Sequence, residues 1–366
     1  MGKKLDSILA KVQKDYKVNI SSARESGVIE RLQLDSPGMN YCFGGGMPLG
    51  RIIMLHGEES SGKSTISEWL ATQVQKKYDG KNTVVYLDYE YTFDSAHAEE
   101  LGLDLDNNFI LVRPTNGEDG FNLVRDLVDT GEVGLVVIDS ITAVASKASC
   151  EDAFSGFAGG KNAGMISSAL KMLAPYLYNN KCTMILIAQE RDNIGAMYGP
   201  NFKVGTSRAP KFYSSWTARV SRTGDITDKD KGLIGIEMRV RNTKNKVGIA
   251  KRDANMTLYF AEGFRVDDEY VDYLKALGLV EQKGAYYSNS EWIADDGTVG
   301  MKVCGLEAVK DWLHANPKMY EKIKQQVTEL ICGHTILDND NEDDDEGTTV
   351  LEDGTVINSD GEIIEE

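Results

Sequence analysis

The sequence has few cysteines and no long apolar run, and each shortage argues against a class of protein. Its five cysteines are scattered, odd in number and form no C-x-x-C pair, which argues against a zinc site or a disulfide framework. No stretch approaches the about 18 consecutive apolar residues of a membrane helix, and the first residues, MGKKLD, lack the apolar core of a signal peptide. We therefore expect a cytoplasmic protein with reduced thiols and no membrane partner.

Positive charge is also in deficit, but unevenly along the chain. The net charge is −17, yet residues 338–366 hold 13 acidic and no basic side chains, so the preceding residues carry 44 acidic against 40 basic ones. Within 201–252 the balance reverses to 13 Lys and Arg against 4 Asp and Glu. That basic segment is suited to contact phosphates. The acidic tail is either a solvated, disordered end or a competitor for the basic surface.

A phosphate-binding motif stands out at residues 57–64, GEESSGKS. In this spacing the backbone N–H groups surround a polyphosphate, Lys63 reaches the β and γ oxygens and the Ser64 hydroxyl binds magnesium. Chance produces the pattern in roughly one chain in a hundred of this length. Here an apolar, strand-like run at 51–56 enters the motif and an apolar-striped helix leaves it. The sequence therefore predicts a nucleoside triphosphate site.

Three β-rich runs further along the chain end in Glu90, Asp139 and Gln189. Ligands of open α/β sheets bind beyond the carboxyl ends of the strands, so Glu90 is placed to act as a base for an attacking water. Asp139 would deliver a carboxylate to magnesium; a buried strand ending at a turn is the alternative for that run taken alone. Gln189 puts an uncharged amide where it can sense a γ-phosphate.

The alternation of strands and helical segments predicts an α/β fold with a doubly wound, mostly parallel sheet and right-handed crossovers. We expect the helical segments at 66–78, 94–101, 118–130 and 163–178. Two Gly-rich stretches, about 149–164 and 190–210, interrupt this rhythm, and each follows one of the catalytic strand ends. Their aromatic and basic residues suit single-stranded nucleic acid, and a loop attached to Gln189 can respond to the γ-phosphate.

An amphipathic helix is expected near the N-terminus, at residues 5–16. A helix of this length is not stable alone, so it docks either on its own domain or on a neighbouring copy. The pattern by itself leaves both open.

Together these features resemble the bacterial RecA recombinases and their phage-encoded relatives of the UvsX kind. The resemblance covers about residues 5–330 and is carried by GEESSGKST, YLDYEYTFD, LVVIDS, IAQERDNIGAMYG, KFY and RVRNTKNK. It implies a RecA-like P-loop ATPase core at 37–263, an N-terminal oligomerisation arm at 1–36, a small α/β C-terminal domain at 264–334 and an acidic disordered tail at 335–366. It also favours docking of the N-terminal helix on the adjacent protomer.

For the nucleotide site the resemblance implies ATP and Mg²⁺ as cofactors. Glu90 falls on the catalytic glutamate, Gln189 on the allosteric glutamine, and Ser64 and Asp139 on the magnesium ligands. Lys244 and Lys246 fall on two lysines that reach across the filament interface to the neighbour's ATP; pattern alone would make them a basic, solvated strand face. The implied nucleotide contacts are Gly57, Glu58, Ser60, Ser61, Gly62, Lys63, Ser64, Thr65, Asp94, His97 and Asp139.

The resemblance also implies contacts with DNA and with a second subunit. Ile194 falls on the residue inserted between base triplets, and Lys211 and Phe212 on the segment that meets the neighbouring subunit. The implied DNA contacts are Lys161, Lys171, Arg191, Ile194, Gly195, Arg208, Arg239 and Arg241. Three positions depart from the family pattern: His97 stands where a tyrosine commonly stacks on adenine, and Gly164 and Thr217 replace arginines.

The function implied is ATP-dependent homologous recombination and DNA repair, with a place in the SOS response. The protein would form helical filaments on single-stranded DNA, pair them with homologous duplex DNA and exchange strands, with DNA-stimulated ATP hydrolysis. Its expected partners are single-stranded DNA, double-stranded DNA, further copies of itself, a single-strand-binding protein and loaders.

Three other functions share a core of this kind. A hexameric replicative helicase would carry a large N-terminal domain, and few residues precede the core here. A signalling or clock-type ATPase would not use DNA, which the basic segment and the two Gly-rich stretches disfavour. A filament-forming DNA-binding protein without ATPase activity is disfavoured by Glu90.

Overall fold

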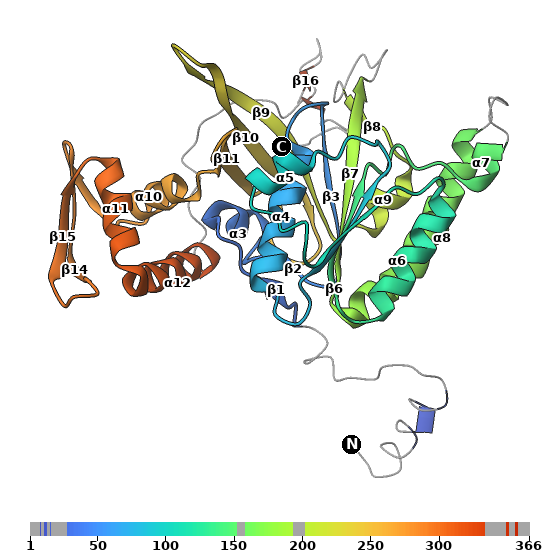
Figure 1. The fold of residues 1–366 in the computed structure, drawn as a ribbon, viewed down its shortest axis with the longest axis horizontal. Helices are drawn as coiled ribbons and strands as arrows, with labels where there is room; N and C mark the ends of the chain where they lie inside the picture. The colour runs from blue at the N-terminus through green and yellow to red at the C-terminus, as the bar shows by residue number, and fades with distance from the viewer. Residues whose placement is uncertain are drawn as a thin grey trace.

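The computed structural model describes residues 8, 11, 12, 15, 28–151, 158–192, 202–333, 349, 350, 356 and 357. Within these ranges, ten strands form one twisted sheet at the centre of the molecule (Figure 1). Nine of them follow the order β12 (Gly263–Phe264), β11 (Asp253–Tyr259), β10 (Gly232–Asn245), β9 (Trp216–Asp228), β3 (Ile52–Gly57), β7 (Thr183–Asp192), β6 (Val133–Asp139), β4 (Thr83–Asp88) and β5 (Phe109–Val112).

The half of the sheet from β9 to β5 is parallel, and the pairs from β9 to β12 are antiparallel. The tenth strand, β8 (Phe202–Val204), forms an antiparallel pair with the end of β7. Every residue of β3 and of β6 is buried, as expected for central parallel strands covered on both faces. The predicted α/β fold with a mostly parallel sheet is confirmed.

Helices cover both faces of this sheet (Figure 1). One face packs against α4 (Lys63–Lys77), whose Ile66, Trp69 and Leu70 are buried in the first apolar core. The other face packs against α6 (Gly117–Asp129) and α8 (Ala158–Asn180), which fill the second core. The shorter helices of this region are α3 (Pro37–Phe43), α5 (Ser95–Glu100), α7 (Lys147–Glu151) and α9 (Arg208–Tyr213).

A smaller unit, which we call the C-terminal lobe (residues 266–333), lies beside the sheet and has its own apolar core (Figure 1). It consists of α10 (Val266–Ala276), β13 (Glu281–Lys283), β14 (Tyr286–Ile293), β15 (Val299–Cys304), α11 (Leu306–Ala315) and α12 (Pro317–Gly333). Tyr41 of α3 joins this core, so α3 connects the lobe to the sheet. Two short strand pairs complete the described structure: β1 (Arg31–Leu32) with β2 (Met47–Pro48), and β16 (Thr349–Val350) with β17 (Val356–Ile357).

The two Gly-rich stretches are less irregular than the sequence suggests. In the first, α7 extends to Glu151 and α8 begins at Ala158, so residues 158–164 are helical rather than a loop. Asn162 holds this start of α8 against α7, because its Oδ1 accepts hydrogen bonds from the Ser146 N–H (2.9 Å) and the Ser149 hydroxyl (2.7 Å). These contacts help to offset the low helix propensity of glycine, about 1 kcal/mol per residue relative to alanine. In the second stretch, β7 and β8 form the base of a hairpin.

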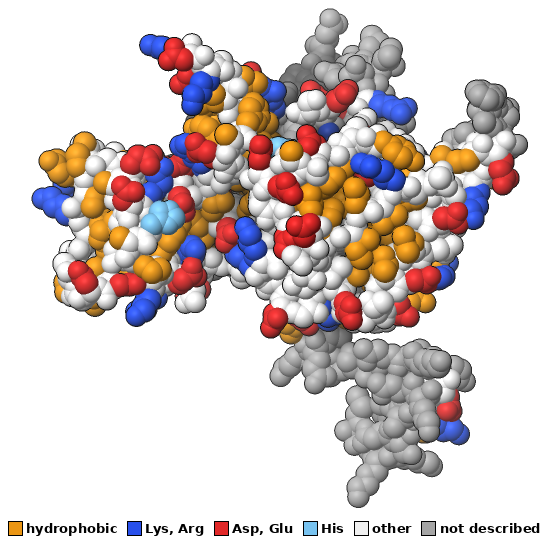
Figure 2. Space-filling view, viewed as in Figure 1, with side chains coloured by type: hydrophobic (Ala, Val, Ile, Leu, Met, Phe, Trp, Pro, Cys, Tyr) orange, Lys and Arg blue, Asp and Glu red, His pale blue; other side chains and the backbone are white. Residues whose placement is uncertain are grey.

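The surface carries charges of both signs. On the face in Figure 2, acidic and basic side chains are interspersed, and apolar side chains gather both on the part that holds the central sheet and on the C-terminal lobe. Leu111 on the edge strand β5 and Leu123 on α6 are each 38% exposed. Within the described part of the chain, no helix combines the length and apolar character needed to cross a bilayer.

Candidate nucleotide-binding and catalytic site

The P-loop connects β3 to the first turn of α4, as the motif predicts. Two of its glycines are required by the backbone. A Cβ on Gly57 would lie 2.2 Å from the Val220 carbonyl oxygen, and Gly62 caps α4 with a φ of 92°, in the left-handed region. The loop therefore ends at the N-terminus of a 15-residue helix, where backbone N–H groups and the helix dipole favour an anion.

The other loop residues expected to contact nucleotide belong to this same turn. Lys63 and Ser61 are buried, Ser64 and Thr65 are half-buried, and Glu58 and Ser60 are exposed. Lys63 donates to the Gly57 carbonyl at 3.2 Å, to the Ser61 hydroxyl at 3.4 Å and to the Glu58 carbonyl. Burial lowers the pKa of Lys63, although the carboxylates of Asp139, Glu190 and Glu90 oppose this change. The ammonium group is thus held inside the loop, where phosphate oxygens can take over from carbonyls.

A hydroxyl and a carboxylate meet at the expected magnesium position. The Oδ2 atom of Asp139 accepts hydrogen bonds from the hydroxyls of Ser64 and Tyr86, both at 2.7 Å. Burial raises the pKa of Asp139; the two hydrogen bonds lower it, and the negative charges of Glu90 and Asp88 raise it again. The described residues contain no group of three or more His, Cys, Asp or Glu suited to a metal. A single hydroxyl and carboxylate instead fit Mg²⁺, which takes its remaining ligands from nucleotide phosphates and water.

Glu90 and Gln189 are in direct contact beside this position. Glu90 lies two residues beyond β4, and its Oε1 accepts hydrogen bonds from Gln189 Nε2 at 2.9 Å and from the Ser140 hydroxyl. The strand register explains the meeting, because Asp88 pairs with Asp139 across β4 and β6, and Ile138 pairs with Leu186 across β6 and β7. Glu90 therefore follows the end of one strand that flanks β6, and Gln189 lies on the other. The predicted base, metal ligand and sensor thus share one edge of the sheet.

Two further residues expected to contact the nucleotide, Asp94 and His97, lie at the start of α5. Asp94 caps this helix by accepting from the N–H groups of Ala96 (3.0 Å) and His97 (3.4 Å). The His97 ring is half-buried, and its Nε2 is 3.9 Å from the Glu68 carboxylate on α4.

Glu68 is a site residue that the sequence analysis missed. It is 4% exposed, and its Oε2 has no hydrogen-bond partner among the described residues. Burial, followed by the negative charges of Asp139 and Asp94, raises the pKa of Glu68 to about 8. The sequence carried little signal for it, because Glu68 does not lie on the helical stripe of Ile66, Trp69 and Leu70 and is buried only because α4 is covered on all sides from Ile66 to Val74. Tyr86 and Ser140 were missed as well, because neither a strand tyrosine nor a serine after a strand identifies its partner.

Lys244 and Lys246 contact α9 within the same chain. Lys244 Nζ donates to the carbonyls of Lys211 and, at 3.5 Å, Phe212. Lys246 Nζ donates to the Phe212 carbonyl at 3.1 Å and lies 5.2 Å from the centre of the Phe212 ring, which is 68% exposed. Burial, then the positive charges of Lys246 and Lys211, lowers the pKa of Lys244. The predicted interface residues and the two predicted catalytic lysines therefore form one cluster.

The expected DNA contacts are spread over several elements. Arg239 and Arg241 of β10 both pair with Asp253, with shortest distances of 2.5 and 3.3 Å. The remaining described members are exposed, on α8 (Lys161, Lys171), near the end of β7 (Arg191) and at the start of α9 (Arg208). Ile194 and Gly195 lie outside the described residues.

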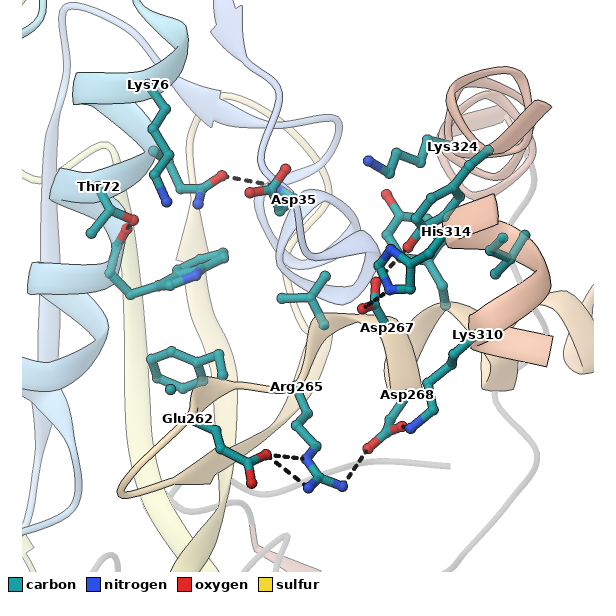
Figure 3. Close-up of a pocket in the computed structure, with 18 of the residues that line it drawn as sticks. Asp35, Thr72, Lys76, Glu262, Arg265, Asp267, Asp268, Lys310, His314 and Lys324 are labelled. Carbon is teal, nitrogen blue, oxygen red and sulfur yellow. Dashed lines mark hydrogen bonds and ion pairs between the residues drawn. The ribbon is translucent and has the colours of Figure 1, made fainter. Parts of the chain in front are cut away.

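A separate pocket of about 930 Å³ lies between α4 and the C-terminal lobe (Figure 3). The P-loop residues do not line it. Its charged side chains largely satisfy one another: Lys310 contacts Asp268 at 2.6 Å, and His314 contacts Asp267 at 2.8 Å. This pocket is therefore distinct from the nucleotide site.

The site combines a P-loop between a buried strand and a helix, a serine–aspartate pair for a metal and a glutamate at the next strand end. These features define a P-loop nucleotide-binding ATPase on an α/β sheet. Comparison with known proteins gives the family. Residues 3–265 match the model of the RecA N-terminal domain. Protein RecA of Chlorobium chlorochromatii is 32% identical over 308 residues, 84% of each chain. Protein RecA of Cereibacter sphaeroides is 32% identical over 330 residues, 89% of this chain and 92% of the relative.

Protein RecA of Rickettsia bellii is 31% identical over 332 residues, 89% of this chain and 93% of the relative. The chain therefore belongs to the RecA family. Its function is that of the family: DNA-dependent ATP hydrolysis and strand exchange in DNA recombination and repair. The predicted family, the ATPase activity and the function in recombination and repair are confirmed.

Proposed function

We propose that this chain binds ATP with Mg²⁺, forms a helical filament on single-stranded DNA and hydrolyses ATP at a site completed by the neighbouring copy. The observation that carries the proposal is the pair of hydrogen-bonded groups at the P-loop: Ser64 with Asp139, and Gln189 with Glu90. The first pair supplies a position for the metal and the second supplies a base, and phosphoryl transfer requires both.

Within one chain, different residues bind the phosphates, the metal and the attacking water. The loop N–H groups and Lys63 bind the β and γ phosphates, and Ser64 and Asp139 hold the metal. Mg²⁺ neutralises charge on the phosphates. Glu90 orients the attacking water and accepts its proton. Both hydrogen bonds that Glu90 accepts from the described residues go to its Oε1. Its Oε2 is therefore the atom that takes the proton.

Gln189 connects this chemistry to DNA. Its amide is bonded to the base, and the strand that carries it continues into the β7–β8 hairpin at the second Gly-rich stretch. A γ-phosphate that competes for the amide would alter that hairpin, and with it the grip on DNA. We assign the DNA contacts implied by the sequence, including Ile194, Arg239 and Arg241, to the state in which the γ-phosphate is bound.

Lys244 and Lys246 complete the site of the neighbouring copy. Both already lie against Phe212, whose exposed ring is suited to a subunit interface. Positive charge placed where the γ-phosphate charge spreads accelerates its transfer, and supplying that charge from a second chain makes hydrolysis depend on assembly.

We further propose the domain division expected from the sequence, with an arm at 1–36, the core at 37–263, the small domain at 264–334 and an acidic tail at 335–366. The separate apolar core of the C-terminal lobe supports the second boundary. A single-strand-binding protein, filament loaders and a cytoplasmic location belong to the same proposal.

The first test is ATP hydrolysis at fixed magnesium without DNA, with single-stranded DNA and with duplex DNA. The proposal expects strong stimulation by single strands. Equal turnover in all three conditions would overturn it.

The shared site is tested by mixing two inactive variants, Glu90→Gln and the double variant Lys244→Ala, Lys246→Ala. A double-variant chain keeps its own Glu90 and can borrow lysines from a Glu90→Gln neighbour. In a random equal mixture, roughly one quarter of the interfaces have that arrangement, so about one quarter of the wild-type rate should return. If the mixture stays as inactive as its components, the lysines do not act in trans.

A further inference from the structure

A second charged network crosses three adjacent strands next to the site. Arg219 on β9, His56 on β3 and Glu190 on β7 lie side by side, and the register pairs His56 with Arg219. Glu190 accepts hydrogen bonds from His56 Nδ1 at 2.7 Å and from Arg219 Nε at 3.1 and 3.2 Å. Arg219 also donates from its terminal nitrogen to the Glu58 carboxylate at 3.1 Å.

The centre of this network is a buried, ionised carboxylate. The Glu190 side chain is 1% exposed. Burial alone would raise the pKa of Glu190, but the hydrogen bonds and electrostatic attraction of His56 and Arg219 outweigh it and hold that pKa below its usual value. Because the carboxylate is ionised, His56 Nδ1 must be the donor in their contact. An ion buried in this way is kept in place by its partners, and removing one partner leaves it uncompensated.

One end of the network contacts the P-loop, and the other end contacts the base of the β7–β8 hairpin. His56 immediately precedes Gly57, and Glu58 is the second residue of the P-loop, whose carbonyl accepts from Lys63. At the other end Glu190 follows Gln189 and pairs with Val204 of β8, at the base of the hairpin. Arg219 contacts a carboxylate at each end, Glu190 and Glu58.

We propose that Arg219 is a positioning residue that links the P-loop to the base of the β7–β8 hairpin, as a second connection beside Gln189. When Lys63 exchanges its hydrogen bond to the Glu58 carbonyl for one to a phosphate, Glu58 moves. Because the Arg219 guanidinium is bonded to both Glu58 and Glu190, this movement also shifts Glu190. The inference rests on the proposed function, because it assumes that nucleotide binding controls DNA affinity. It adds residues outside the phosphate-binding and catalytic set.

The test compares the full-length protein with Arg219→Met. Affinity for a fluorescent single-stranded oligonucleotide is measured with ADP and with a non-hydrolysable ATP analogue, and the ratio of the two affinities reports the coupling. Arg219→Met should reduce this ratio at least about fivefold, the lower end for coupled sites. Affinity for the ATP analogue without DNA should change less than about twofold, since Arg219 reaches the loop through the Glu58 side chain.

Two variants control the experiment. Arg222→Met removes an arginine three positions along the same strand, paired with Asp225 at 2.7 Å, and should leave the ratio unchanged. Glu190→Gln keeps the shape and an acceptor oxygen but loses the charge that binds Arg219, and should reduce the ratio as Arg219→Met does. Since both act through one link, the double variant should be no worse than the more affected single variant.

The outcomes separate the inference from the proposed function. If the wild type binds DNA equally with ADP and the ATP analogue, the proposed function fails. If the wild type discriminates and both Arg219→Met and Glu190→Gln keep the full ratio, the inference is wrong and the proposed function stands. An equal loss of affinity in both nucleotide states would make Arg219 a plain DNA contact and also overturn the inference. Should Arg219→Met fail to fold, Glu190→Gln decides the question.

Discussion

Replacing Glu90 by glutamine separates the basicity of this side chain from its packing. In the wild type, Oε1 accepts from Gln189 at 2.9 Å and from Ser140. A glutamine of the same length can direct its amide oxygen to both donors. What it cannot do is accept a proton from water at the second position, so the variant should keep the architecture of the site and lose turnover.

The expected loss of turnover follows from comparing the contribution of the general base with that of the two hydrogen bonds to Oε1. A positioned general base accelerates a reaction about 10²- to 10⁴-fold, which corresponds to roughly 3–5 kcal/mol of barrier. Weakening two hydrogen bonds from charge-assisted to neutral costs only about 1 kcal/mol each. We therefore expect kcat to fall at least about 100-fold while KM for ATP and the ATP-dependent affinity for single-stranded DNA stay within about threefold.

The assay is ATP hydrolysis at saturating single-stranded DNA, with DNA binding followed in parallel by fluorescence anisotropy. Ser140→Ala is the matched control, because it removes one hydrogen bond to Glu90 and leaves the base; its loss of kcat should stay below about tenfold. A Glu90→Gln protein that hydrolyses ATP at the wild-type rate would refute the assignment of the base. A variant that no longer binds nucleotide would show that Glu90 acts structurally.

Three further predictions concern the surroundings of the site and the C-terminal lobe. Gly57→Ala should weaken ATP binding at least about tenfold in a nucleotide titration, because its Cβ would lie 2.2 Å from the Val220 carbonyl oxygen and displace the loop. Tyr86→Phe removes one of two hydroxyls bonded to buried Asp139, and should lower the free energy of unfolding by about 1–2 kcal/mol and raise the magnesium concentration needed for hydrolysis; an unchanged magnesium requirement would contradict the metal assignment. Burial raises the pKa of Glu269 to about 7, so its protonated form is favoured on folding, and its contribution to stability is full below about pH 4.5 and lost as the pH rises through 7. Glu269→Gln should therefore gain roughly 1–3 kcal/mol over the wild type between urea titrations at pH 5 and pH 8, and an equal difference at both pH values would rule this out.

The position of the site was predictable because each of its polar residues ends an apolar run. Glu90, Asp139 and Gln189 all follow segments whose pattern is typical of buried strands, and the carboxyl ends of parallel strands lie at one edge of a sheet. The P-loop glycines were likewise fixed by local geometry. Here the local pattern and the global fold agree.

The contacts between these residues were not predictable, since they depend on strand order. Gln189 meets Glu90 because β6 lies between β4 and β7, and Arg219 meets Glu190 because β3 lies between β9 and β7. No property of a single segment specifies its neighbours in a sheet. Glu68 was hidden for another reason: a carboxylate on a helix is expected to face solvent unless its surroundings are known.

The two lysines that we propose to complete the neighbour's site already have partners within the single chain. Lys244 and Lys246 donate to carbonyls of α9 and so have partners before any second copy arrives. Hydrogen bonds from charged donors contribute about 1.5–3 kcal/mol each, and moving the lysines to a phosphate must replace them. The γ-phosphate offers more negative charge than a carbonyl, whereas its loss on hydrolysis removes that advantage. ATP would therefore favour the assembled arrangement of these lysines, and hydrolysis would return them towards α9, which weakens the interface at the moment when the filament has to release its DNA.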